Sequence, residues 1–88
     1  MHRYALLLSL FTAPLAFAEA NCKAYETGTT SVIAEEDASS MMDCSKRMQN
    51  AVKAARCSSV PGGSTFKYEM WHAKLASKRT PQQVYCKK

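Results

Sequence analysis

The sequence predicts an α+β fold: a small disulfide-stabilised ββαββ domain with two layers, in which one antiparallel sheet packs on one helix. Three observations predict it. Four short segments alternate with the two-residue period of strands, and the segment between the second and the third has the period of an amphipathic helix. The exported part has only about 70 residues, a length at which a single apolar core is marginal, and its four cysteines supply the missing cross-links.

The first twenty residues predict a signal peptide. A positively charged start, Met1–Arg3, precedes an apolar run, Tyr4–Phe17, that is too short to span a bilayer comfortably. Small residues allow cleavage after Ala18 or after Ala20, which leaves one exported domain, residues 21–88. The charged and amide residues before the first cysteine do not suit a lipidation site. We therefore expect a periplasmic or secreted protein with no stable membrane anchor.

The mature chain is basic. Loss of Arg3 leaves eleven Lys and Arg residues against six or seven acidic ones, a net charge of +5 or +4 that depends on the cleavage site. The pairs Lys78-Arg79 and Lys87-Lys88 favour a protein partner or an anionic envelope component. Nucleic-acid binding is not expected, because aromatic residues are not interleaved with basic ones apart from Trp71 with Lys67.

The first half of the mature chain predicts a hairpin followed by a helix. Cys22–Glu26 and Thr29–Ala34 are rich in strand-forming residues, and Thr27-Gly28 between them predicts the turn. From about Glu35 the apolar residues recur at intervals of three and four, which predicts an amphipathic helix that ends near Cys57. Acidic residues at its expected start and basic residues at its end suit the helix dipole.

The second half predicts two more strands. Ser64–Leu75 is the longer one, and Gln82–Cys86 follows a polar turn that ends at Pro81. One face of the long strand carries the presumed core residues Phe66, Tyr68, Met70 and His72. The other face carries Lys67, Glu69, Trp71, Ala73 and Leu75.

The widely spaced cysteines predict two disulfides, since none has the two-residue spacing of a zinc or thioredoxin-like site; they are Cys22, Cys44, Cys57 and Cys86. Thirteen helical residues separate Cys44 from Cys57 by about 20 Å, so these two cannot pair with each other. The strand directions bring Cys22 near the first half of the helix and Cys86 near its far end. We therefore favour Cys22 with Cys44 and Cys57 with Cys86, each bridge contributing roughly 3 kcal/mol.

Two chemical functions compete with simple structural roles. Met70 and His72 share a strand face and offer ligands that soft Cu(I) accepts, so a periplasmic copper-binding protein is one alternative to a core role for both. A small basic secreted nuclease is the other, with Glu69 and His72 as its acid–base pair. Their odd spacing turns them to opposite faces unless a bulge intervenes. We expect no enzyme, no catalytic residues, no cofactor and no resident metal.

A single helix covers only one face of a four-stranded sheet, and the remaining face must meet solvent, a second copy or a partner. We therefore expect a non-enzymatic binding or accessory protein of the inhibitor, immunity or envelope-associated type. Its expected partner-binding residues are Trp71, Lys67 and Leu75. A homodimer through the same face is a second arrangement. The competing interpretation is a bulge near Met70 that turns Trp71 and Leu75 into the core.

Overall fold

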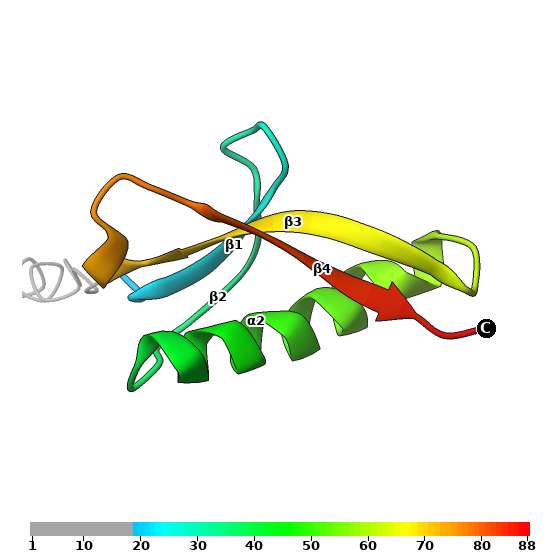
Figure 1. The fold of residues 1–88 in the computed structure, drawn as a ribbon, viewed down its shortest axis with the longest axis horizontal. Helices are drawn as coiled ribbons and strands as arrows, with labels where there is room; N and C mark the ends of the chain where they lie inside the picture. Colours follow the sequence, from blue (N-terminus) through cyan, green and yellow to red (C-terminus); the bar gives the residue numbers. More distant parts are fainter. Residues whose placement is uncertain (1–18) are drawn as a thin grey trace, which may run out of the picture.

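The computed structural model describes residues 19–88, so all but the last two residues of the predicted signal peptide lie outside it. Its strands are β1 (Cys22–Glu26), β2 (Val32–Glu36), β3 (Ser64–His72) and β4 (Thr80–Cys86), and its helix is α2 (Met41–Arg56). Short 3₁₀ turns follow α2 and β3, namely η1 (Cys57–Ser59) and η2 (Ala73–Leu75). The strands form one antiparallel sheet in the order β2-β1-β3-β4, with α2 along one face (Figure 1). The expected ββαββ two-layer fold is confirmed.

The hairpin differs from the expectation in its second strand. Gly28 takes the left-handed turn conformation, with φ of 75°, but β2 starts three residues later than Thr29 and extends to Glu36. Glu36 pairs with Cys22 at the end of the ladder, after a register irregularity between Ala24 and Tyr25. The acidic residues expected to begin the helix therefore belong to the strand and the loop behind it.

Helix α2 begins six residues beyond Glu35. Ser40 is its N-cap, and its hydroxyl accepts a hydrogen bond from the backbone N–H of Asp43 at 3.0 Å. The Asp43 carboxylate accepts from the backbone N–H of Ser39, which with Arg47 lowers the pKa of Asp43. The predicted end near Cys57 is confirmed, since α2 stops at Arg56.

The core lies between α2 and the covered face of the sheet. Met48 and Val52 project from α2 and are fully buried, and burial of side chains of this size contributes about 2 kcal/mol each. The strands supply Tyr68, Met70 and Val84, each at most 3 % exposed. The alternation expected for β3 thus holds for its second half, where Tyr68, Met70 and His72 are buried.

Both disulfides form with the expected pairing. Cys22 bonds to Cys44, which joins β1 to the first turn of α2, and Cys57 bonds to Cys86, which joins the end of α2 to the end of β4. Two bridges in so small a domain indicate an oxidising environment. Within residues 19–88 no helix is both long and apolar enough to cross a membrane.

Strand β3 ends earlier than expected, at His72. The chain then turns through η2, and Ala76 takes φ 57° and ψ −117°, the angles of the first central residue of a type II′ turn. Lys78 N–H donates to the Leu75 carbonyl at 3.0 Å and closes that turn. Leu75 packs against the core as a result, so the prediction that it lies beside Trp71 on the uncovered strand face is wrong.

Candidate functional site

The sheet face turned away from α2 has no covering layer among the described residues (Figure 1). We call it the open face. Strand alternation and the observed register define it by the side chains of Lys23, Tyr25, Lys67, Glu69, Trp71 and Gln83. It forms one continuous surface, because Lys23 pairs with Trp71, Tyr25 with Glu69, and Lys67 with Gln83.

Trp71 is half-buried on the open face and fixed on two sides. Its indole N–H donates to the carbonyl of Ala76 at 2.6 Å, and the ammonium of Lys23 lies 5.7 Å from its ring centroid. The β3 register runs unbroken past Met70, so no bulge turns Trp71 into the core. The indole is therefore presented in a defined orientation.

Arg79 organises the centre of the open face. Its guanidinium lies 3.7 Å from the centroid of the Tyr25 ring and forms an ion pair of 2.9 Å with Glu69. It also donates to the Thr29 carbonyl, while the Glu69 carboxylate accepts from the Gly28 N–H at 3.3 Å. The hydrogen bond from Arg79 is the main reason why the pKa of Glu69 lies below its ordinary value. These contacts fasten the β1–β2 loop to β3 and to the turn before β4.

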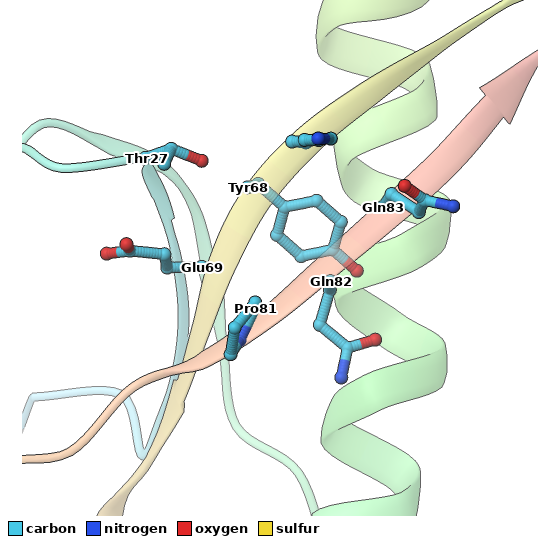
Figure 2. A pocket seen from close by; sticks show the side chains of 7 residues that line it. Thr27, Tyr68, Glu69, Pro81, Gln82 and Gln83 are labelled. Atoms are coloured by element: carbon cyan, nitrogen blue, oxygen red, sulfur yellow. The ribbon is translucent and has the colours of Figure 1, made fainter.

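A hollow of about 380 Å³ lies next to this cluster. Figure 2 shows its lining side chains, which come from β3, β4 and the loop after β1: Thr27, Lys67, Tyr68, Glu69, Pro81, Gln82 and Gln83. The Lys67 ammonium, the Thr27 hydroxyl and the Gln83 amide supply hydrogen-bond donors. The lining contains no histidine or cysteine, and the hydrogen bond from Arg79 lowers the pKa of its one carboxylate, Glu69, so the hollow suits polar recognition.

Known proteins give no match. No protein-family model matches the chain, and neither does any curated protein or solved structure.

Two of the three expected partner-binding residues share the open face. Lys67 and Trp71 are four positions apart on β3, about 13 Å along the strand, while Leu75 lies in η2. Sequence reasoning missed Tyr25 and Arg79. The alternation of β1 could have identified Tyr25 as a residue of the open face, whereas Arg79 comes from a turn whose direction no periodicity reveals.

The residues of the copper hypothesis lie on the covered face. Met70 and His72 are each 3 % exposed, Met70 within the apolar core. His72 Nδ1 accepts from the Lys74 N–H at 3.1 Å, and its buried Nε2 has no hydrogen-bond partner in the described part of the chain. Among residues 19–88 no group of three or more His, Cys, Asp or Glu side chains is placed to hold a metal ion. These positions favour a packing role for both residues.

The residues of the nuclease hypothesis lie on opposite sides of the sheet. Glu69 faces outward and is held by Arg79, and His72 faces α2. This is the arrangement expected for an odd spacing in a regular strand. The two groups do not meet, and a low pKa makes the Glu69 carboxylate a weak base.

Proposed function

We propose that the protein is a small exported, non-enzymatic binding or accessory protein, periplasmic or secreted, that binds an acidic protein partner with its open face. The partner would be the target of an inhibitor or immunity-type protein, or a component of the cell envelope. One observation above the others supports this proposal: a partly exposed tryptophan is held in a fixed orientation on a sheet face that no other described element covers.

The fixed orientation of Trp71 favours binding for an energetic reason. Tryptophan is enriched among the residues that dominate interface energies, and a side chain already ordered before binding loses little entropy on association. The Ala76 carbonyl and the Lys23 ammonium restrict the indole in the free protein. The Arg79 guanidinium restricts the Tyr25 ring in the same way, so this ring also loses little entropy on association.

The charges around Trp71 favour an acidic partner. Lys67 is exposed and forms no ion pair within residues 19–88, so its charge is free to meet a carboxylate. Glu69, the acidic residue at the centre of the open face, is already neutralised by Arg79. A net positive charge on the whole chain would accelerate encounter with such a partner.

The experiment is affinity capture from the native compartment with the oxidised protein, followed by measurement of the purified partner's affinity for variants. Trp71→Ala and, separately, Lys67→Glu should each weaken binding, Trp71→Ala by about 30-fold or more, as expected for a central aromatic residue. The matched control is Met42→Ala, which removes a 77 % exposed apolar side chain from α2.

Circular dichroism and melting temperature separate the outcomes. Loss of binding by folded Trp71→Ala and Lys67→Glu, with Met42→Ala unchanged, supports the proposal. Equal binding by all three variants contradicts it. A concentration-dependent dimer that Trp71→Ala dissociates would replace the foreign partner by a second copy of this chain.

A further inference from the structure

Charge is sorted along the molecule. Five of the seven acidic residues gather near the first turn of α2, where the ends of β1 and β2 also lie: Glu19, Glu35, Glu36, Asp37 and Asp43. The other two, Glu26 and Glu69, are paired with arginines at 2.7 and 2.9 Å. The opposite end of the molecule therefore carries an excess of basic side chains, because Glu26 there is paired with Arg56. It consists of the last turn of α2, η1 and the end of β4, on the right in Figure 1.

A surface hollow of about 490 Å³ lies at this basic end. Its lining residues are Lys53, Cys57, Tyr85 and Lys87, so two ammonium groups border it and no acidic side chain does. Both lysines are exposed, and neither forms an ion pair within residues 19–88. We call it the basic hollow.

The Cys57–Cys86 disulfide connects the two backbone segments that carry Lys53 and Lys87. Lys53 lies one helical turn before Cys57, and Lys87 directly follows Cys86, whose Cα is 5.2 Å from that of Cys57. The Gly63 N–H donates to the Cys86 carbonyl at 2.6 Å, which fixes the backbone next to Lys87. The backbone that carries the two lysines is therefore fixed without a ligand, which lowers the entropy cost of binding one.

The helix dipole explains only part of this arrangement. A cation in the last turn of α2 is stabilising by itself, which accounts for Lys53. Lys87 is not on the helix, and it adds a second positive charge to a lining that contains no Asp or Glu side chain, so the two like charges repel each other. An anion in the hollow would relieve it, and lysine is a common ligand of phosphate, as a compact point charge.

We infer that the basic hollow binds a phosphate group, with Lys53 and Lys87 as its two cations and the Tyr85 hydroxyl as a further donor. Tyr85 is 54 % exposed, and an exposed tyrosine beside lysines suits the polar boundary of a membrane. The phosphate of an anionic lipid headgroup is therefore the expected source. Tyr85 lies two residues beyond Gln83 on the same side of β4, but the site shares none of the six residues that define the open face.

The test measures binding to vesicles of phosphatidylglycerol and phosphatidylcholine in equal parts, with pure phosphatidylcholine vesicles for comparison. Each lysine near an anionic membrane raises the binding affinity roughly fivefold. The double variant Lys53→Gln/Lys87→Gln should therefore bind the phosphatidylglycerol vesicles about 30-fold more weakly than the wild type. The control Lys46→Gln/Lys78→Gln removes two exposed lysines elsewhere and so has the same net charge as the test variant. The affinity of this control for the vesicles should fall by less than about threefold, because charges far from the basic hollow are screened by salt.

A second arm distinguishes the sources of phosphate. Inorganic phosphate is titrated while backbone amide shifts are followed by NMR. Saturable shifts confined to Lys53, Tyr85 and Lys87, without binding to vesicles, support the site and assign it a soluble phosphate. Equal losses in the two double variants, or neither vesicle binding nor saturable shifts, overturn the inference.

Discussion

The indole N–H of Trp71 donates to the carbonyl oxygen of Ala76 at 2.6 Å, so a residue of the open face is positioned by a turn outside the strand. Ala76 holds that turn in a conformation that favours glycine, with φ of 57° and ψ of −117°. The orientation of the proposed binding residue thus depends on a strained neighbour.

Ala76→Gly should relieve this strain. A non-glycine residue in such a region destabilises the folded state by an amount of order 1–3 kcal/mol. Glycine removes this strain, but it also raises the entropy of the unfolded chain, which offsets part of the stabilisation. We expect an increase of about 1 kcal/mol in the free energy of unfolding, measured by urea denaturation of the oxidised protein. Ala54→Gly, at an exposed position of α2, is the control and should lose about 1 kcal/mol. Destabilisation by both variants would contradict the assigned turn.

The fold was predictable where covalent and periodic constraints agree. The cysteine pairing followed from strand direction and helix length, because these place Cys22 and Cys86 at opposite ends of α2, each within bonding distance of a helix cysteine. The helix start was wrong because the acidic run at Glu35 suits a helix N-terminus equally well. Ser40, with its hydroxyl on the Asp43 N–H, is the cap that the chain uses.

The open face was predictable only in part. Alternation along β3 identified Lys67 and Trp71 as residues of the uncovered side. Leu75 was misplaced because the strand was extended through η2, where the chain leaves the two-residue period. Arg79 was beyond prediction, since its contacts with Tyr25 and Glu69 depend on the path of a turn.

Glu69→Gln should make stability less sensitive to acid. The pKa of Glu69 is lowered in the folded protein, first by the hydrogen bond from Arg79, so the folded state favours the ionised carboxylate. Its stabilising effect is complete above the unfolded value, near pH 4.5, and is lost as the pH falls through the lower folded value. Melting temperature between neutral pH and pH 2 should therefore fall less steeply in Glu69→Gln than in the wild type.

The control for this measurement is Glu35→Gln, which removes an exposed carboxylate that forms no ion pair within the described chain. It should follow the wild-type acid profile closely. Parallel profiles for Glu69→Gln and Glu35→Gln would show that the Arg79 pair does not contribute to acid sensitivity.

Tyr68→Phe should not destabilise the protein. The Tyr68 hydroxyl is buried and has no hydrogen-bond partner among residues 19–88, and burial raises the pKa of Tyr68 to about 12. Removal of an unpaired buried hydroxyl should raise the free energy of unfolding by about 1 kcal/mol. Spectrophotometric titration should lose its most alkaline tyrosine step in the same variant. Tyr85→Phe, on an exposed ring, should leave stability unchanged, and a clear loss in Tyr68→Phe would reveal a partner for its hydroxyl.

Mild reduction should open the two disulfides in a fixed order. Cys22 and Cys44 are completely buried, whereas Cys57 is half-buried and lines the basic hollow, where two ammonium groups attract a thiolate reductant. Alkylation and mass spectrometry at increasing reductant should therefore label Cys57 and Cys86 first. Lys53→Gln/Lys87→Gln should slow this first reduction step without changing the order. Each bridge closes a loop of similar length, so replacement of either cysteine pair by alanine should lower the free energy of unfolding by roughly 3–4 kcal/mol. First labelling at Cys22 and Cys44 would mean that local opening of β1, and not access at the end of α2, controls reduction.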